Sequence, residues 1–453
     1  MKTSGNSWQR FSGWGRTAPT VAQQKRVADA YDIADRIRSG GPLLVRGLGR
    51  SYGDAAQCAG GTLADMSGLA SVQWHDGGLV TVGAGLSLRD LINATTPRGW
   101  FVPVTPGTSW VTVGGAIAAD VHGKNHHRDG SFGMHVTRMG VVDGSGTYCD
   151  LRPDDQRFWA TVGGMGLTGA IVDATLRLLP VETSQMLVST RRTRDLDDTI
   201  EHLHHADAAR YSVAWLDCLA KGSAIGRGIV TFGDHARAND VWTRDEQRTE
   251  PILSTPRIAA PRWLPSTSLN KHTIGLFNSV WYQRAPRVRD DELQSIKKFF
   301  HPLDAVAGWN HIYGRRGFIQ YQFVVPDSAY EELRSLFLTL VEAEVPSFLT
   351  VLKRFGAGNS GFLSFPIAGW TLAVDIPTDA PSLAQLLDGL DERVVAAGGR
   401  VYLAKDSRMA AAMLPRMYPN LERWLSVRDE MDPHGVFASD LGRRLRLVPA
   451  ARS

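Results

Sequence analysis

The stretch PGTSWVTVGGAIAADVHGKNHH, residues 106–127, concentrates small side chains that leave the backbone open to a ligand. Glycine and alanine allow a flat ring or a phosphate to approach the main chain closely. Two further glycine-rich stretches occur, VRGLGRSYGDAAQ at residues 45–57 and TVGGMGLTGAIVDATLRLLP at residues 161–180. Three separate patches of this kind within the first 180 residues predict one extended ligand that touches all of them.

The first patch carries Gly47, Gly49 and Gly53 in the spacing GxGxxxG, which differs from the GxGxxG of dinucleotide-binding folds. No long helix with an acidic residue about 20 positions further on follows it, so a Rossmann domain is not expected. Successive backbone N–H groups without a Cβ in the way can still cradle a pyrophosphate. A tight turn without a ligand is the alternative for this patch taken alone.

The six residues HGKNHH at 122–127 raise the question of a metal site. His122 and His126 are four residues apart, but no acidic residue lies between them, and a metal needs about three or four converging ligands. Glycine also disfavours a continuous helix here. We therefore expect no metal at this motif.

The bulk composition is typical of a soluble globular protein with two domains. Of the 453 residues 43% are hydrophobic, and the net charge of +4 is scattered along the chain. This disfavours nucleic-acid binding, while attraction to anionic lipid or phosphate and an ordinary solvated basic surface both stay open. Cys58, Cys149 and Cys218 form no CxxC pair, which argues against disulfides. We expect no secretory signal and no membrane span, because no run of about 18 apolar residues occurs.

Apolar periodicity predicts an α+β fold. In the first part we expect a helix over residues 21–40, a strand at 43–45, a helix over 87–95 and a hairpin around the DGSG turn. Later elements are longer, with amphipathic helices and alternating strands that predict an antiparallel sheet flanked by helices. The helices are expected at residues 194–209 and 327–345, and the strands at 317–326, 346–356 and 369–377.

These patterns predict a ligand-binding domain over residues 1–183 and a substrate domain over 184–398, followed by a C-terminal segment, 399–453, that returns to the first domain. Residues 250–273 are rich in Pro and Ser and are expected to be a mobile insert. The insert is either a lid or lipid-facing element, since RWLP places a Trp beside a basic residue, or a linker without a role.

Several motifs carry a resemblance in chain order: SGWGRTAPT, RGLGRSYGD, VTVGGAIAADVHGKNHH, WATVGGMGLTG, FIQYQFVVP, LSFPIAGW, AKDSR and VFASDLGRRL. The sequence is similar to the vanillyl-alcohol-oxidase, or PCMH-type, FAD-binding superfamily and, within it, to the decaprenylphosphoryl-β-D-ribose 2-oxidase family. The resemblance implies a two-subdomain FAD-binding domain. It also implies oxidation of the C2 hydroxyl of decaprenylphosphoryl-β-D-ribose to a 2-keto sugar, the first half of the epimerisation that yields the arabinose donor for cell-wall arabinan.

The same resemblance implies an NADH-dependent short-chain reductase as partner and a peripheral position at the periplasmic face of the plasma membrane. Two alternatives stay open. One is an oxygen-using sugar, alditol or aldonolactone oxidase of the same superfamily, and the other is a flavin-loaded scaffold without turnover.

By this resemblance the flavin contacts fall mainly on the first two glycine-rich patches. They are Arg46, Gly47, Leu48, Gly49, Arg50, Ser51, Tyr52, Gly53, Asp54, Gly107, Thr112, Val113, Gly114, Gly115, Ala119, Asp120, Val121, His122, Ile171 and Tyr402. Many relatives link a histidine at the position of Arg50 to the flavin. Arginine cannot form that bond, so FAD is expected to be non-covalent.

Oxidation of a secondary alcohol needs a base, a positive group near the flavin and a clamp for the sugar. The resemblance makes Lys405 the first candidate for the positive group or the base, and His122 a candidate for proton transfer or substrate orientation. The expected substrate contacts are Lys124, Gln320, Gln322, Lys353, Phe355, Ala373 and Lys405. Asn125, His126 and His127 are expected to hold their loop through hydrogen bonds.

Two positions depart from the mycobacterial members of the family. Ala373 stands where they carry a cysteine, so inhibitors that capture that thiol would find no nucleophile. Phe300 stands where they carry a tyrosine, which removes one polar contact.

Overall fold

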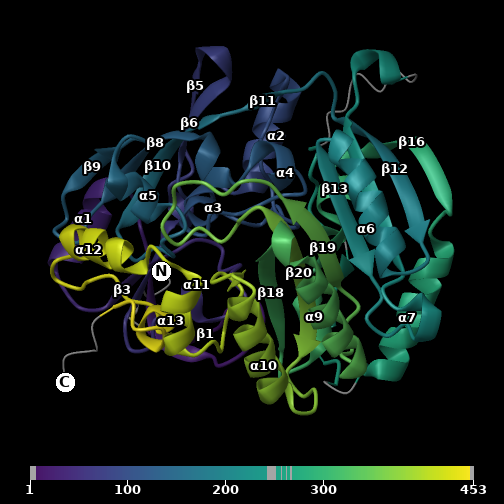
Figure 1. Ribbon diagram of the computed structural model, residues 1–453. Coiled ribbons are helices and arrows are strands. Elements are labelled where there is room, and N and C mark those ends of the chain that lie inside the picture. Colours follow the sequence, from purple (N-terminus) through teal and green to yellow (C-terminus); the bar gives the residue numbers. More distant parts are fainter. Residues whose placement is uncertain (1–6, 242–250, 257, 262, 266–267, 449–453) are drawn as a thin grey trace.

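The computed structural model describes residues 7–241, 251–256, 258–261, 263–265 and 268–448. Figure 1 shows two bodies side by side, the first 180 residues on the left and an eight-stranded sheet on the right. The C-terminal helices, in yellow, lie against the left body. The predicted α+β fold is confirmed.

The first sheet of the left body has four strands in the order β1-β2-β4-β3. They are β1 (Trp8–Phe11), β2 (Thr20–Arg26), β3 (Leu43–Arg46) and β4 (Thr62–Asp65). β2 and β3 both run parallel to β4, and α1 (Ala30–Arg38) is the crossover helix between them. The predicted strand at residues 43–45 is therefore confirmed as β3.

The predicted helix over residues 21–40 is wrong in its first part, where the chain forms β2. This strand pairs with β1 on one side and β4 on the other, so its backbone groups are satisfied by neighbouring strands. The helix begins only at Ala30, after Asp29, whose carboxylate accepts hydrogen bonds from two backbone N–H groups of the first turn.

The second sheet of the left body has five antiparallel strands in the order β5-β6-β10-β8-β9. They are β5 (Val72–His75), β6 (Leu79–Gly83), β8 (Val136–Val142), β9 (Tyr148–Leu151) and β10 (Ala170–Arg177). The DGSG turn joins β8 to β9, which confirms the predicted hairpin. The helix predicted over residues 87–95 is α2 (Leu88–Thr95), capped by the Ser87 hydroxyl.

Short elements complete the left body. They are α3 (Val113–Ala118), α4 (His126–Asp129), α5 (Gln156–Thr161) and the two-stranded pair β7 (Trp100–Phe101) with β11 (Leu179–Pro180). α3 is the small-residue helix of the opening stretch.

The right body is one antiparallel sheet in the order β16-β12-β14-β13-β19-β20-β18-β21. Its strands are β12 (Gln185–Thr193), β13 (Tyr211–Leu216), β14 (Gly228–His235), β16 (Val288–Ser295), β18 (Phe318–Pro326), β19 (Thr350–Phe355), β20 (Gly369–Pro377) and β21 (Arg400–Val401). In Figure 1 three helices cover its near face: α6 (Leu196–His205), α9 (Tyr330–Glu342) and α10 (Leu383–Ala396). The predicted antiparallel sheet flanked by helices is confirmed.

The two faces of β18 point to different neighbours. Tyr321 donates a hydrogen bond to Asp391 of α10 on the helix side, 2.9 Å away. Gln322, one residue later, lies 3.1 Å from His122 of the left body. The surface of the sheet that does not carry α10 therefore forms one wall of the junction between the bodies.

The C-terminal segment returns to the left body through α11 (Leu414–Met417), α12 (Leu421–Met431) and α13 (Asp440–Arg444). Trp424 donates its indole N–H to the Ala160 carbonyl of α5. Arg444 binds Asp54 through two hydrogen bonds of 2.8 Å. The division at residues 183 and 398 stays a prediction, and β21 of the right sheet lies just beyond its second boundary.

The described parts of the insert at residues 250–273 are anchored to the rest of the chain. β15 (Ile258–Ala259) pairs in parallel with β17 (Val306–Ala307), and the Leu253 carbonyl accepts hydrogen bonds from Arg89 and Asn93. Glu250, Arg257, Arg262, Ser266 and Thr267 lie outside the described residues. α7 (Lys271–Arg284) begins inside the predicted insert, whose last three residues are therefore helical, and α8 (Ile296–Phe300) follows further along the chain. Among the described helices, none combines the length and the apolar character needed to cross a membrane.

Candidate active site

The three glycine-rich patches of the sequence lie together in the left body. A Cβ on Gly47 would lie 2.2 Å from the Thr112 hydroxyl oxygen, so only glycine permits this approach of the first patch to the second. The third patch is hydrogen-bonded to α3, since Gly163 and Met165 donate their backbone N–H groups to the Ile117 and Ala118 carbonyls.

The backbone of the first two patches stays accessible where a ligand would need it. Gly47, Gly49, Gly114 and Gly115 are half-buried, and Gly107 is exposed with open space where a Cβ would stand. Ser51 and Ala119 are also half-buried, whereas Leu48 exposes its side chain. This surface suits a ligand that is recognised through main-chain groups.

Asp120, another predicted cofactor contact, already has hydrogen-bond partners within the protein. Asp120 is fully buried and accepts hydrogen bonds from Ser131, Gly133, Asn359 and Ser364. Burial raises the pKa of its carboxyl group, and these four donors oppose the shift. Because its oxygens are already engaged, Asp120 shapes the loop that ends at His122.

The remaining predicted cofactor contacts are mostly buried. Tyr402 donates a hydrogen bond of 2.7 Å to the Ala119 carbonyl, which ties the C-terminal segment to the second patch. Thr112, Val113, Val121 and Ile171 are buried, and Gly53 packs so closely on Asp406 that a Cβ would not fit.

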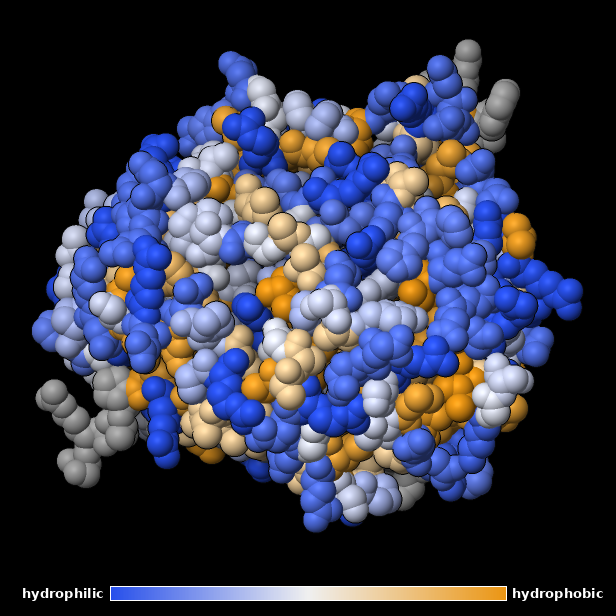
Figure 2. All heavy atoms as spheres, in the orientation of Figure 1, coloured by the Kyte–Doolittle hydropathy of each residue, from blue (hydrophilic) through white to orange (hydrophobic). Residues whose placement is uncertain are grey.

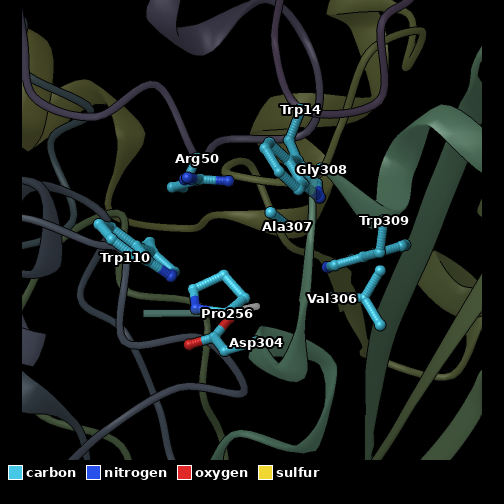
Figure 3. A pocket seen from close by; sticks show the side chains of 9 residues that line it. All are labelled: Trp14, Arg50, Trp110, Pro256, Asp304, Val306, Ala307, Gly308 and Trp309. Carbon is cyan, nitrogen blue, oxygen red and sulfur yellow. The ribbon is translucent and has the colours of Figure 1, made fainter. Parts of the chain in front are cut away.

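Arg50 borders a small pocket of about 130 Å³, shown in Figure 3. Its guanidinium carbon lies 3.9 Å from the centre of the Trp14 ring, and its Nε has no hydrogen-bond partner among the described residues. Asp304 faces the same pocket, where Thr108 and Ser109 donate to its carboxylate. The pocket is lined by Trp14, Arg50, Trp110, Pro256, Asp304, Val306, Ala307, Gly308 and Trp309.

Three lysines converge where the two bodies meet. Only nine of the 50 basic residues of the chain are lysines, and Lys124, Lys353 and Lys405 are three of them. Each keeps part of its side chain accessible, although the surrounding protein desolvates its amine. We call the junction of the two bodies at these three partly accessible lysines the cleft.

Desolvation lowers the pKa of all three amines. The pKa falls to about 7 for Lys124 and to about 8 for Lys405, where the Asp375 carboxylate opposes the shift. Burial, together with repulsion from Lys405 and Lys124, lowers the pKa of Lys353 well below its usual range. An arginine could not respond in this way, since its guanidinium stays protonated.

His122 lies between Gln322 and Lys353, and a chain of hydrogen bonds sets its tautomer. The Thr371 hydroxyl donates to the Phe323 carbonyl, so it accepts from the Gln322 amide, which then presents N–H to His122 Nε2. Burial lowers the pKa of His122 well below its usual range, so the ring is neutral and carries its proton on Nδ1.

That Nδ1 lies 3.1 Å from Lys353 Nζ. An N–H group needs an acceptor, and an amine accepts only through its lone pair, so this contact requires Lys353 in its neutral form. The hydrogen-bond geometry and the lowered pKa of Lys353 thus agree. Phe355, predicted to share the strand face of Lys353, packs its ring 4.7 Å from that of His122.

Lys405 lies on the other side of the cleft, beside the first patch. Its ammonium is 5.6 Å from the centre of the Tyr52 ring. Asp375 bonds to Gln320 and to the Tyr313 hydroxyl, and burial raises its pKa to about 7 although Gln320 and Lys405 oppose the shift. The Asp375 carboxylate favours the charged form of Lys405, and the Lys405 ammonium favours the charged form of Asp375, so each opposes the pKa shift that burial causes in the other.

Asp375 and Thr371 contact the predicted substrate residues Gln320 and Gln322, and the sequence analysis missed both. Both lie in β20, whose nine residues are all buried. An acidic residue inside an otherwise apolar strand was the available signal, because a carboxylate is rarely buried without a partner.

The hydrogen bonds predicted to hold the HGKNHH loop are present at Asn125 and His127 but not at His126. Asn125 donates to the Pro103 carbonyl and His127 contacts the Ala209 carbonyl, so both hold the loop. His126 makes no such bond: both ring nitrogens lack a partner among the described residues, and its ring packs 4.4 Å from Phe355. Burial beside Lys353 lowers the His126 pKa to about 3, so the ring stays neutral and acts as a packing group.

Lys124 and Ala373 occupy the wall of the cleft. Lys124 donates to the Phe299 carbonyl, and its ammonium lies 4.1 Å from the centre of the Phe299 ring. Ala373 is buried and stands opposite Gln322 in the register of β18 and β20. Phe300 packs on Phe101 in the core, 5.3 Å between ring centres.

Comparison with known proteins defines the class. The family profile of an FAD binding domain matches residues 20–152, and that of D-arabinono-1,4-lactone oxidase matches residues 372–445. Together with the fold and the glycine-rich patches, these matches make the chain an FAD-dependent oxidoreductase.

The full-length relatives narrow this class. Decaprenylphosphoryl-beta-D-ribose oxidase of Mycolicibacterium smegmatis is 42% identical over 97% of this chain and 98% of its own length. L-gulono-1,4-lactone dehydrogenase of Mycobacterium tuberculosis is 24% identical over 97% and 98%, and alditol oxidase of a Streptomyces species is 22% identical over 98% and 99%. The chain belongs to the decaprenylphosphoryl-β-D-ribose oxidase family.

The residues present fit an FAD cofactor. The accessible backbone at Gly47, Gly49, Gly114 and Gly115 suits a pyrophosphate, and the amines around the cleft supply positive charge for an isoalloxazine that becomes anionic on reduction. The unpaired Nε of Arg50 is a further donor at the edge of the first patch.

Proposed function

We propose that this protein oxidises the C2 hydroxyl of decaprenylphosphoryl-β-D-ribose to the 2-keto sugar, the first half of epimerisation to decaprenylphosphoryl-arabinose for cell-wall arabinan. The observation that carries the proposal is the 42% identity, over nearly the full length of both chains, to the Mycolicibacterium smegmatis oxidase. The cleft between the two bodies is the proposed active site.

FAD supplies the two-electron acceptor for this oxidation. In the proposal the backbone of residues 46–54 and 112–115 holds its pyrophosphate, and Tyr52, His122 and Tyr402 flank its ring system. Attachment is non-covalent, because the arginine at position 50 cannot form the histidyl bond of many relatives.

The protonated Lys405 is proposed to stabilise the negative charge that develops during oxidation. Its side chain lies beside Tyr52, and Asp375 keeps part of its positive charge near neutral pH. Lys405 also contacts the sugar in this scheme, together with Gln320 and Lys124.

The hydroxyl proton is proposed to leave through the pair of His122 and Lys353. The single lone pair of neutral Lys353 accepts from the Nδ1–H group of His122, which holds the amine in place. To take the hydroxyl proton, this lone pair is proposed to turn from His122 to the substrate. Gln322 and Thr371 keep His122 in the required tautomer. His122 is thus a positioning residue for the base, while Phe355 and Ala373 shape the pocket.

The keto product of the proposed reaction requires a second enzyme to reduce it. A 2-keto sugar becomes the epimeric alcohol only by a reduction in a second step, so we propose a separate NADH-dependent short-chain reductase as the partner enzyme. A polyprenyl substrate also calls for work at a membrane surface, and we propose a peripheral position at the periplasmic face of the plasma membrane.

A second candidate is an oxygen-using sugar, alditol or aldonolactone oxidase. The low but full-length similarity to L-gulono-1,4-lactone dehydrogenase and alditol oxidase supports this second candidate. A flavin-loaded scaffold without turnover is the third.

One experiment separates the three. The holoenzyme is mixed anaerobically with farnesylphosphoryl- or decaprenylphosphoryl-β-D-ribose, and flavin absorbance is followed. Bleaching by the lipid-linked ribose and not by free alditols or lactones is the expected result. A parallel aerobic assay measures peroxide: rapid turnover of free sugars with peroxide release would replace the proposal with the oxidase. A flavin that no sugar bleaches would leave the scaffold.

A further inference from the structure

Exposed apolar side chains are concentrated in one segment of the chain. Sixteen large hydrophobic residues are exposed among the described residues, and eight of these lie between positions 258 and 293. They are Ile258, Trp263, Leu276, Phe277, Val280, Trp281, Val288 and Leu293. Figure 2 shows hydrophobic residues at the lower right of the view, in the region where Figure 1 places α7.

Four of these residues form a ridge on α7, which we call the α7 ridge: Leu276, Phe277, Val280 and Trp281. They are 69%, 47%, 42% and 50% exposed. At about 100° per residue they span an arc of roughly 140° on one side of the helix. The rings of Phe277 and Trp281 stack on each other, with centres 6.3 Å apart.

The opposite side of α7 is fixed to the sheet. Asn278 is fully buried and donates to Asp217 and to the Ser347 carbonyl, at 2.9 and 3.1 Å. Tyr282 donates to the Thr193 carbonyl, and Ile274 is buried. The α7 ridge is therefore presented outward by a helix that is held rigidly from behind.

The helix that carries the ridge and the turn after it hold only basic charges, and Asp290, Asp291 and Glu292 follow in β16. Residues 271–289 contain Lys271, Arg284, Arg287 and Arg289 and no Asp or Glu. Lys271 pairs with Glu344 and Arg289 with Glu292, while Arg284 and Arg287 are exposed and have no acidic partner among the described residues. Aromatic and aliphatic side chains rimmed by unpaired arginines match an anionic lipid surface.

The ridge also connects to the proposed active site. Ring contacts run from Phe277 to Phe348, Tyr313, Phe318 and Tyr52, with centre distances of 6.0, 5.7, 4.1 and 5.6 Å. Trp309 of the pocket beside Arg50 joins the same series through Phe318, at 5.6 Å. Packed rings therefore connect the ridge to Tyr52, which lies beside Lys405.

We propose that the α7 ridge, with Arg284 and Arg287, docks this protein onto the surface of an anionic membrane. Docking would bring the cleft to a substrate that carries its sugar on a lipid, a benefit that rests on the proposed function. The docking itself rests on the ridge and its charges.

The test is sedimentation of the FAD-loaded protein with vesicles of pure phosphatidylcholine or of phosphatidylcholine containing one third phosphatidylglycerol. The wild type is expected to bind the anionic vesicles about tenfold more strongly, and less strongly as salt is raised. Phe277→Ser with Trp281→Ser, and separately Arg284→Glu with Arg287→Glu, should each reduce this binding about tenfold. Trp8→Ser with Tyr31→Ser is the matched control, since both residues are exposed in the left body, and it should bind like the wild type.

Equal binding by the wild type and the ridge variants, or no wild-type binding to either vesicle, would overturn the proposal. A wild type that sediments as a dimer by ultracentrifugation, with ridge variants that are monomers, would instead assign the ridge to a second copy of the chain. Flavin bleaching by soluble farnesylphosphoryl ribose without vesicles should be unchanged in the ridge variants. If the wild type binds vesicles but that substrate never bleaches it, the proposed function fails and the docking stands.

Discussion

The left body holds 29 of the 46 glycines of the chain within its first 183 residues and brings one lysine, Lys124, to the cleft. The right body and the segment that follows it bring Lys353 and Lys405, together with Gln320, Gln322 and Asp375. The first offers main-chain groups on a surface without side chains, and the second offers side chains whose protonation is tuned by burial. The difference teaches that cofactor binding and chemistry are divided between the bodies, so substitutions in each should fail in different ways.

Lys405→Met should have the largest effect and should fall on chemistry alone. Removing the positive charge beside Tyr52 is expected to slow anaerobic flavin reduction by about a thousandfold, within the usual range for one charged group of an active site. FAD content should stay that of the wild type. Stopped-flow absorbance measures the rate, and Lys221→Met, on an exposed lysine paired with Glu344, is the control. A variant that loses FAD but reduces its remaining flavin normally would contradict the division.

His122→Ala should come next, with flavin reduction about a hundredfold slower and bound FAD retained. Without the ring, Lys353 loses the Nδ1–H group that holds it and Gln322 loses its acceptor. Unchanged reduction would remove His122 from the mechanism. Thr371→Val tests the same series of hydrogen bonds. It frees the Gln322 amide to rotate and should slow flavin reduction less than His122→Ala does.

Gly47→Ala should lower the affinity for FAD and leave the rate of flavin reduction nearly unchanged. The added Cβ would stand 2.2 Å from the Thr112 hydroxyl oxygen, so the first two patches must separate. FAD affinity is expected to fall about ten- to a hundredfold, a loss typical of backbone strain. The flavin that stays bound should be reduced at nearly the wild-type rate. Fluorescence titration of the apoprotein with FAD measures the affinity. Gly389→Ala is the control, because a Cβ there meets nothing and Gly389, like Gly47, is not a glycine of positive φ.

The pH dependence of flavin reduction should follow Lys405. Its pKa of about 8 means that the cation is lost as pH rises, so the rate is expected to fall about fivefold between pH 8 and pH 9. Lys405→Arg keeps the charge throughout this range and should show no such fall, although its rate at pH 7 will be lower. A wild-type rate that instead rises through pH 8 would make neutral Lys405 the base.

Lys124 should give the smallest effect, and one on stability. Its folded pKa of about 7 lies below the value near 10.5 of an unfolded lysine, so between these limits the unfolded chain binds a proton that the folded protein does not. Stability from this group therefore increases with pH. The Tm of the wild type minus that of Lys124→Met is expected to rise by about 2 °C from pH 7 to pH 9. A difference independent of pH would show that the amine is solvated.

The sequence analysis succeeded where structure depends on neighbouring residues and failed where it depends on tertiary contacts. The hairpin at the DGSG turn, the helix after Ser87 and the strands of the right body were predictable, because local turn chemistry, capping and two-residue periodicity are properties of neighbouring residues. The helix expected over residues 21–40 failed where pairing with β1 and β4 overrode a weak helical pattern. His126 failed because burial against Phe355 left its ring without hydrogen-bond partners.

The sequence by itself determined the glycine-rich surface for an extended cofactor, since a main chain is left bare wherever side chains are absent. It also determined that no histidine stands at position 50. Only the tertiary structure decided that Lys353 meets His122 from a position 231 residues away, that Asp375 faces Lys405, and that α7 turns its apolar side outward. The pKa of a lysine and the exposure of a tryptophan depend on what the rest of the chain packs around them, and that packing brings together residues that are distant in the sequence.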